Sequence, residues 1–304
     1  MIKIKSVVSI IIYLWSSVCL SQTTLITPSP AGGQSDFIAR TLAFSYNQQN
    51  DNKIIVENKP GAEGIIGTNF VANKRGNKNF MLLGSNTQLI YAIKTNKSAV
   101  EFNPKTSFKP IIKLTRVYMA LATSIESDVY KIQHLNNTNL IYGYPNAASN
   151  VFLDDLFIKK LKLNTIPLSI YYKSSQTMLI DATTNRINVV LSALSSLNPL
   201  VQSNKLRLIA ITSPERLSAF KDVPVVSESI PNFNLYLWYG LLLPNDVDYN
   251  IVIQYNKAFN QILKEADIIN KLKSQHHTII GGSIESFEKT IQKDMIDILN
   301  INEQ

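Results

Sequence analysis

The sequence predicts an α/β protein of two domains, and three observations indicate this class. Short apolar segments of strand character alternate with helical segments along most of the chain. The chain has 304 residues, of which 45% are hydrophobic, and this is enough for two sizeable cores. Loops rich in glycine, hydroxyl and amide groups follow several of the apolar segments. A parallel sheet flanked by helices has this organisation, and its ligands bind where the strands end.

The first expected unit is a strand, a loop and a helix. Leu25–Thr27 is apolar and β-prone, and the loop after it contains Gly32 and Gly33, which give the backbone freedom to turn. A helix with an apolar face follows, and Ser35 or Asp36 is placed to cap its first turn. Because free amides at the start of a helix attract anions, the loop suits a carboxylate or a phosphate. An ordinary strand-to-helix turn has the same composition, and the loop matches neither glycine pattern of nucleotide-binding proteins.

The remaining elements continue this alternation. Further strands are expected at 53–57, 80–83, 111–114, 118–122, 140–143, 166–172, 187–191, 206–212 and 235–244, and further helices at 67–74, 251–272 and 283–299. The apolar strand 235–244 is interpreted as the return crossing into the first domain, because the helices after it lack a sheet of their own. The expected domains are therefore 22–122 together with 235–304, and 123–234.

The first 21 residues have the layout of a secretory signal peptide. A basic start, Met1–Lys5, precedes an apolar run, Val7–Trp15, which is too short for a membrane span. Cleavage after Ser21 removes the only cysteine, Cys19, and leaves a mature chain without thiol chemistry. The competing interpretation is a lipoprotein acylated at Cys19, to which the preceding Val18 is a poor fit.

Composition and motifs argue against nucleic-acid, metal and enzymatic functions. The formal net charge of +8 is spread along the chain, with no arginine-rich run and no zinc-ligand spacing. His134, His276 and His277 lack the companion residues of a catalytic or metal motif and are expected at the surface. We therefore expect no cofactor, no metal and no enzymatic activity. The residues alone indicate an exported α/β protein with an anion-binding cleft.

Several motifs, taken in order, resemble the Bug-type solute receptors of tripartite tricarboxylate transporters. The most specific is Val56–Gly67, and Pro30–Asp36, Leu83–Ser85, Arg207–Ser213 and Trp238–Leu241 fall in the expected order. The similarity covers essentially the whole mature chain. It implies a two-lobed, type II-like periplasmic-binding-protein fold, with a mostly parallel sheet in each lobe and a cleft between the lobes. It also implies a periplasmic receptor, which we expect to be monomeric, that captures a small carboxylate and delivers it to membrane subunits of the transporter.

The resemblance further implies a set of ligand-binding residues. One wall would comprise Ala31, Gly32, Gly33, Gln34, Ser35, Asp36, Ser85, Asn86 and Thr87, and the other Asn146, Ala147, Ala148, Ser149, Asn150, Tyr172, Lys173 and Ser192. In the family, main-chain amides, hydroxyls and water bind the carboxylate. The second wall departs from the family pattern, because Pro145 lacks an amide donor and Ser192 stands where an acidic or amide residue is common. Either specificity has shifted or binding has weakened, and an orphan receptor with a sensing or scaffold role is the alternative function.

The expected ligand is an anion without an obligatory amino group. Asp36 is the only acidic side chain in the set, and we expect it to cap and order the first helix. A buried ammonium group needs a carboxylate or several acceptors, which this set does not offer. Lys173 would attract a carboxylate if it faces inward and would have no effect as a surface residue.

Overall fold

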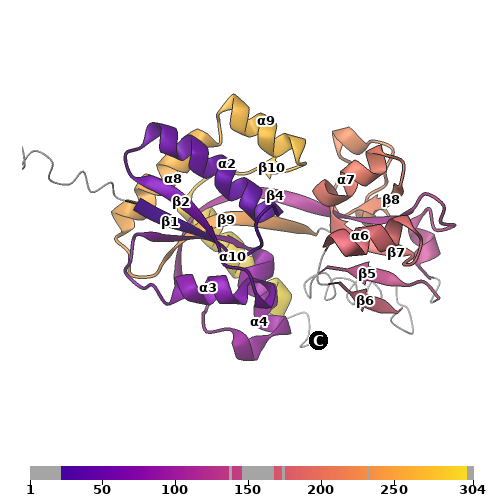
Figure 1. Cartoon of the computed structure of the whole chain (residues 1–304), viewed down its shortest axis with the longest axis horizontal. Helices are drawn as coiled ribbons and strands as arrows, with labels where there is room; N and C mark the ends of the chain where they lie inside the picture. Colours follow the sequence, from indigo (N-terminus) through magenta and orange to yellow (C-terminus); the bar gives the residue numbers. More distant parts are fainter. Residues whose placement is uncertain are drawn as a thin grey trace, which may run out of the picture.

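The computed structural model describes residues 22–136, 139–145, 168–172, 175–231, 233 and 235–299, and within them it has an α/β fold arranged in two halves (Figure 1). The strands are β1 (Gln22–Thr27), β2 (Lys53–Asn58), β3 (Phe80–Ser85), β4 (Phe108–Ser124), β5 (Tyr142–Tyr144), β6 (Ser169–Tyr171), β7 (Val189–Ala193), β8 (Leu206–Ile211), β9 (Tyr236–Pro244) and β10 (Thr278–Ile279). The α-helices are α2 (Gln34–Gln49), α3 (Ile65–Ala72), α4 (Ala92–Thr95), α6 (Ser175–Thr183), α7 (Leu194–Gln202), α8 (Tyr249–Ile262), α9 (Ala266–Ser274) and α10 (Ile284–Leu299). Among these residues, no helix is both long enough and apolar enough to cross a bilayer.

The long strand β4 belongs to two sheets. Its first part, Phe108–Tyr118, pairs with β9, and its last part, Met119–Ser124, pairs with β7 and β8. The first sheet has the order β2–β1–β3–β9–β4 with β10 also on β4, and the second has the order β4–β7–β5–β6 with β8 also on β4. The two strands expected at 111–114 and 118–122 are therefore parts of one strand. Figure 1 shows β4 and β9 extending from the first half toward the second.

The sheets are more mixed than the expected mostly parallel arrangement. The groups β2–β1–β3 and β7–β5–β6 are parallel, as predicted. In contrast, β9 runs antiparallel to β3 and β4, and β4 runs antiparallel to β7, β8 and β10. The physical reason is that β4 carries the chain toward the second half and β9 brings it back, so adjacent strands run in opposite directions. The α/β class is confirmed, whereas the mostly parallel pairing was wrong for these central strands.

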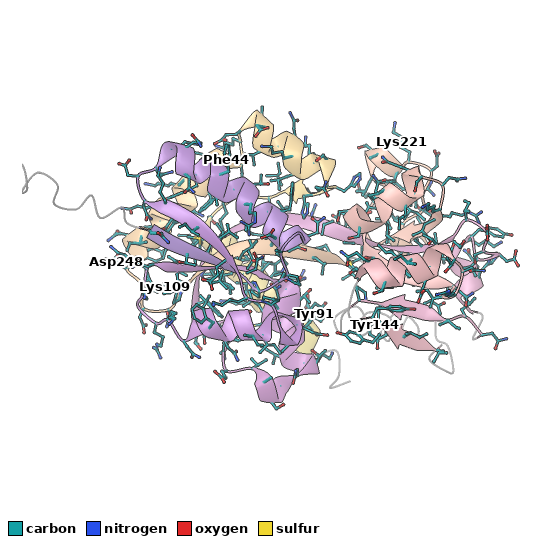
Figure 2. All side chains as sticks on the ribbon, viewed as in Figure 1. Phe44, Tyr91, Lys109, Tyr144, Lys221 and Asp248 are labelled. Carbon is teal, nitrogen blue, oxygen red and sulfur yellow. The ribbon has the colours of Figure 1, made fainter. Side chains whose placement is uncertain are left out.

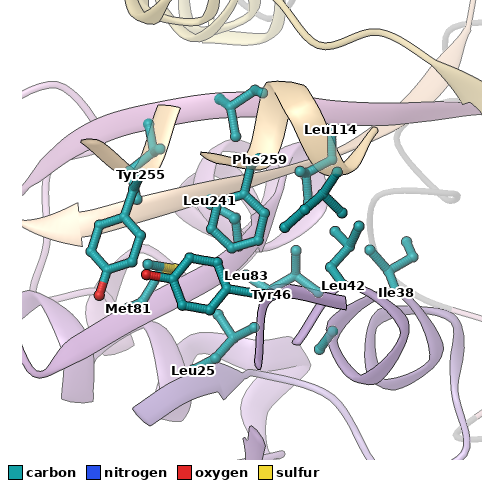
Figure 3. Close-up of a cluster of buried hydrophobic side chains, with 14 of the residues drawn as sticks. Leu25, Ile38, Leu42, Tyr46, Met81, Leu83, Leu114, Leu241, Tyr255 and Phe259 are labelled. Atoms are coloured by element: carbon teal, nitrogen blue, oxygen red, sulfur yellow. The ribbon is translucent and has the colours of Figure 1, made fainter. Parts of the chain in front are cut away.

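Alternate residues of the first sheet face two different helical layers. Met81 and Leu83 of β3 belong to a cluster with α2, α8 and α9, part of which is shown in Figure 3. Leu82, between them, belongs to a cluster with α3 and α10. In this second cluster, the fully buried ring of Phe287 packs edge-on against Trp238. The first sheet is thus covered on both faces, which leaves its strand ends for binding.

The helix expected at 251–272 is two helices, α8 and α9, separated at residues 263–265. Glu265 has an extended backbone at the start of α9. Its carboxylate accepts hydrogen bonds from Ser45 Oγ and Gln49 Nε2 of α2, both at 2.7 Å. This contact with a distant helix redirects the chain, which explains why the local sequence, without proline or glycine at the break, did not predict it.

The second half repeats the two-layer arrangement. Val190 of β7 faces α6 and α7 through Met178 and Leu197. The next residue, Leu191, faces the other layer, where it is in the same cluster as Ile230. The second sheet therefore also presents its strand ends, rather than its faces, to possible ligands.

Candidate functional site

The first set of predicted ligand residues lies at the carboxyl ends of β1 and β3. Gln34, Ser35 and Asp36 form the first turn of α2, and Ser85 ends β3 just before a π-helical turn at Thr87–Tyr91. The N-cap of α2 is Gly33, and no side chain caps the helix, so the expected capping by Ser35 or Asp36 was wrong. Because the first amides of α2 have no side-chain cap, this end of the helix retains donors and partial positive charge that favour an anion.

Gln88 joins the two segments of this set. Its Nε2 donates to Ser29 Oγ at 3.0 Å and to the Pro28 carbonyl at 3.4 Å. Its Oε1 accepts a hydrogen bond from Ser85 Oγ at 3.1 Å, and Ser29 Oγ donates to Ser35 Oγ at 3.3 Å. The structure therefore brings the β1–α2 loop and the end of β3 together. Gln88 was not predicted, and the available signal was its place in the same polar loop, three residues after Ser85.

The carboxylate of Asp36 is buried and fully engaged with protein donors. Its Oδ1 accepts from Arg40 Nε at 2.9 Å and from Asn58 Nδ2 at 3.0 Å, and its Oδ2 accepts from the Gly32 amide at 3.0 Å. Burial alone raises the pKa of Asp36, but these hydrogen bonds hold the pKa below its ordinary value. The hydrogen bond from Arg40 lowers it most. Asp36 is therefore ionised and orders the loop around Gly32 instead of capping the helix.

Only part of the second set belongs to the described residues, because Asn146, Ala147, Ala148, Ser149, Asn150 and Lys173 lie outside them. Tyr172 follows β6, and its hydroxyl donates to Asp181 of α6 at 2.9 Å. Burial, together with this hydrogen bond, raises the pKa of Tyr172 to about 12. Ser192 is buried on β7, where it pairs with Ala120 of β4. The Tyr172 hydroxyl is thus committed to α6.

The described members of the second set, Tyr172 and Ser192, belong to a different half of the structure from the first set. Figure 2 labels Tyr91, in the turn behind the first set, and Tyr144, shortly before the loop at 146–150. In this view, these tyrosines lie on the sides of the two halves that are turned toward each other. Within the described part of the chain, no hydrogen bond joins Tyr172 or Ser192 to the first set. Any ligand that contacts both sets has to lie between the halves.

Additional polar residues occur where the strands cross between the halves. Asn86 Nδ2 donates to the Tyr236 carbonyl at 3.0 Å, while Asn86 Oδ1 is buried without a partner among the described residues. The rings of Tyr118 and Tyr236 pack edge-on, and the Arg116 guanidinium lies 5.3 Å and 5.9 Å from their centroids. Arg116 Nε and Ser195 Oγ are likewise buried without a described partner. The sequence analysis missed Arg116, Tyr118, Tyr236 and Ser195, because they lie in apolar segments without a motif.

His277 is buried beneath the start of α2, although the sequence analysis expected it at the surface. Its side chain is 3% exposed, with Nε2 2.7 Å from Gln34 Oε1 and Nδ1 3.1 Å from Thr115 Oγ1. Burial lowers the pKa of His277 to about 4, so the ring is neutral at pH 7. Both contacts are satisfied when Nε2–H donates to Gln34 and Thr115 donates to Nδ1. A predicted ligand residue, Gln34, is therefore positioned by a neutral histidine.

Gly32 and Gly33 provide a matched pair of substitutions in the loop. Gly32 has φ +79°, whereas Gly33 has φ −82°, which any residue adopts. We expect Gly32→Ala to lower the free energy of unfolding by about 1–2 kcal/mol, because an L-residue is strained in the left-handed region. Gly33→Ala should leave it unchanged or raise it by up to about 1 kcal/mol. Urea unfolding measures both, and equal effects would contradict this loop conformation.

Stability should depend on the protonation of His277. The unfolded chain takes up a proton near the ordinary pKa of 6.5, but the folded chain resists it until about pH 4, so the free energy of unfolding falls as the pH decreases across this window. The loss is at most about 3 kcal/mol. His277→Gln should reduce this slope, measured by urea unfolding at about pH 7 and about pH 5. His134→Gln is the control and should retain it, and an unchanged slope in His277→Gln would contradict the prediction.

Comparison with known proteins agrees with this architecture. The profile of the family described as "Tripartite tricarboxylate transporter family receptor" matches residues 38–301. The periplasmic binding protein BugD is similar, with a TM-score of 0.78 and 20% identity, over 93% of this chain and 97% of its own. MatC from Rhodopseudomonas palustris, solved with malate, has a TM-score of 0.80 and 19% identity, over 92% of this chain and 98% of its own. Rpa4515 of R. palustris, solved with adipate, has a TM-score of 0.81 and 22% identity, over 95% of this chain and 97% of its own.

These similarities confirm the predicted two-lobed fold of periplasmic binding proteins. The family profile covers the chain from the first turns of α2 to beyond the end of α10. It therefore includes β3, β4, β9 and the strands of the second half, and it begins after β1 and the first turn of α2. The chain belongs to the tripartite tricarboxylate transporter receptor family.

Proposed function

We propose that this protein is an exported solute-binding receptor that captures a small carboxylate between its lobes and delivers it to membrane subunits of a tripartite tricarboxylate transporter. Its family and fold are those of solute-binding receptors. Two proteins of similar fold were solved with malate and adipate, which are small dicarboxylates. Among the described residues, no three His, Cys, Asp or Glu side chains are grouped for metal binding. We propose that this chain has no enzymatic activity and binds no cofactor.

The observation that carries the proposal is the electrostatic character of the first set. The uncapped start of α2 supplies main-chain donors, and the Ser85 and Gln88 side chains order the neighbouring loop through hydrogen bonds with each other and with Ser29. Asp36 is the one acidic side chain in this set, and both of its oxygens are occupied by protein donors. Its charge is compensated locally by Arg40, so repulsion of an incoming anion is reduced. Such a site favours a carboxylate over a cation.

We propose that lobe I comprises 22–122 and 235–304 and that lobe II comprises 123–234. The pairing of β4 with strands of both sheets, and the return of the chain in β9, support this division. In this arrangement, the first set forms the lobe I wall, and Asn146–Asn150, Tyr172, Lys173 and Ser192 contribute the lobe II wall. We expect a monomer, because the proposed site is completed by the two lobes of a single chain.

We also propose that the protein is periplasmic and begins at Gln22 after cleavage behind Ser21. The basic and apolar layout of the first 21 residues and the family support this. Intact-mass spectrometry of the protein recovered from cells should give the mass of the chain from Gln22 onward. A chain that begins at a lipid-modified Cys19 would show instead that the protein is a lipoprotein.

The purified protein should bind a plain dicarboxylate more tightly than the matching amino acid. Calorimetry with succinate and with aspartate tests this, because the described part of the proposed site offers no free acceptor carboxylate for an ammonium group. At a free concentration of about one hundred times its dissociation constant, succinate should raise the free energy of unfolding by about 2.7 kcal/mol. Tighter binding of aspartate would contradict the proposed chemistry of the second wall.

A charge substitution in the first set tests whether the ligand lies there, and the same substitution outside the set is the matched control. Thr87→Glu places a carboxylate beside Ser85 and Asn86 and should raise the dissociation constant for succinate by at least about tenfold. Thr95→Glu introduces the same charge on the exposed side of α4 and should leave the constant unchanged within about twofold. If both variants bound succinate like the unmodified protein, the ligand would not lie against the first set.

A further inference from the structure

A cavity of 390 Å³ lies in the first half, away from the candidate carboxylate site. It is lined by Thr23, Tyr46, Asn50, Asn52, Lys78, Asn79, Ile251, Gln254, Tyr255 and Ala258. Thr23 is at the beginning of β1, Asn52 immediately precedes β2 and Asn79 immediately precedes β3. The cavity is therefore at the amino ends of these parallel strands, whereas the candidate carboxylate site is at their carboxyl ends. Figure 2 shows Asp248, which caps α8 next to this region, at the end of the first half that is distant from the second.

The inner wall of the cavity is a cluster of hydroxyl and amide groups. Tyr255 Oη lies 2.8 Å from Thr23 Oγ1, and Asn52 Nδ2 donates to Tyr255 Oη at 2.9 Å and to Thr23 Oγ1 at 3.2 Å. Burial raises the pKa of Tyr46 to about 12 and also raises that of Tyr255, so both phenols keep their protons. Figure 3 shows the Tyr46 and Tyr255 hydroxyl oxygens at the same end of their hydrophobic cluster. The aromatic rings thus anchor two hydroxyls at the cavity.

One acceptor in this cluster is left without a donor. Asn52 Oδ1 is buried and has no hydrogen-bond partner among the described residues. Because a desolvated acceptor without a partner is unfavourable, this position favours a group that brings an O–H or N–H donor. An anionic oxygen at this position would be repelled, and an apolar group would leave the acceptor unmatched.

The other lining groups narrow the choice of ligand. Lys78 is the one charged side chain of the lining, it is exposed at the rim, and the lining contains no carboxylate and no imidazole for a cation. Ile251 and Ala258 provide apolar surface, while the remaining amides can both donate and accept hydrogen bonds. A hydroxyl group also does both. Compounds with several hydroxyls on a carbon ring match this combination of hydroxyl, amide and aliphatic groups.

We propose that this cavity is a second binding site that takes a small neutral polyhydroxy compound, such as a monosaccharide or a cyclic polyol. Its volume lies in the range of small-molecule pockets. Hydroxyls of the ligand donate to Asn52 Oδ1 and exchange hydrogen bonds with Tyr46 and Tyr255, while its C–H groups pack on Ile251 and Ala258. The site is independent of carboxylate binding, because it is formed by the opposite edge of the sheet.

Saturation-transfer NMR of the purified protein with D-glucose, D-ribose and myo-inositol tests this proposal. At least one of these should bind with a dissociation constant on the order of 1 mM. Tyr255→Phe, which removes one hydroxyl and keeps the ring, should weaken binding about five- to tenfold. Tyr249→Phe is the matched control, because Tyr249 is on the same helix but 54% exposed and outside the cavity lining. It should leave binding unchanged.

Ala258→Leu gives an independent test, because it fills the cavity with an aliphatic side chain while succinate binding reports whether the protein remains folded. It should abolish the saturation-transfer signal and leave succinate binding intact. Three results would overturn the proposal. The first is the absence of a signal with all three compounds at a concentration of about ten times the expected dissociation constant. The second is a signal that persists in Ala258→Leu. The third is displacement of the bound compound by succinate.

Discussion

The backbone pairing of β4 is the constraint on which the rest of this structure depends. This 17-residue strand hydrogen-bonds with β9 and β10 in the first sheet and with β7 and β8 in the second. Both of its faces are covered by helices or by clustered side chains, so its register is defined by burial as well as by hydrogen bonds. Because β4 leads out of the first half and β9 leads back, these two strands connect the halves.

At the candidate site, polar side chains are arranged before any ligand binds. Asn58 donates to Thr27 Oγ1, to the Ser29 carbonyl and to Asp36 Oδ1, and its own Oδ1 accepts from Arg40. These contacts order the loop after β1 and occupy both oxygens of the Asp36 carboxylate with protein donors. A site organised in this way loses less conformational entropy on binding than a flexible loop does. The same contacts explain why an acidic residue is compatible with an anion-binding wall.

The two edges of the first sheet have different chemistry for a structural reason. Parallel strands place all the loops that follow them at one edge and all the segments that precede them at the other. The carboxyl edge carries the uncapped start of α2, whose first amides favour an anion. The amino edge carries tyrosine hydroxyls and the unmatched Asn52 oxygen, which favour a neutral donor. The two proposed sites therefore lie at opposite edges of one sheet.

The sequence by itself determined the alternation of strands and helices, the polar loops after β1 and β3, and the family to which they belong. These features depend on local propensity and periodicity, so they can be predicted without partners. Because β1 and β3 are parallel neighbours, the proximity of the loops that follow them also followed from the sequence. The roles of Gln88 and Asn58 did not, because a glutamine or asparagine in a polar loop has no specific signal until its partner is known.

Only the tertiary structure decided which apolar segments join and which polar groups become buried. The segments at 111–114 and 118–122 are one strand because β9 pairs along it as far as Tyr118 and β7 and β8 pair along the rest, and no local pattern specifies these pairings. His277 was expected at the surface, yet it is buried because Thr115, 162 residues earlier, and Gln34 both supply partners for its ring. The α8–α9 break likewise depends on the bonds from α2 to Glu265. Such contacts join residues far apart in the chain, and their effect appears only when the sheets have formed.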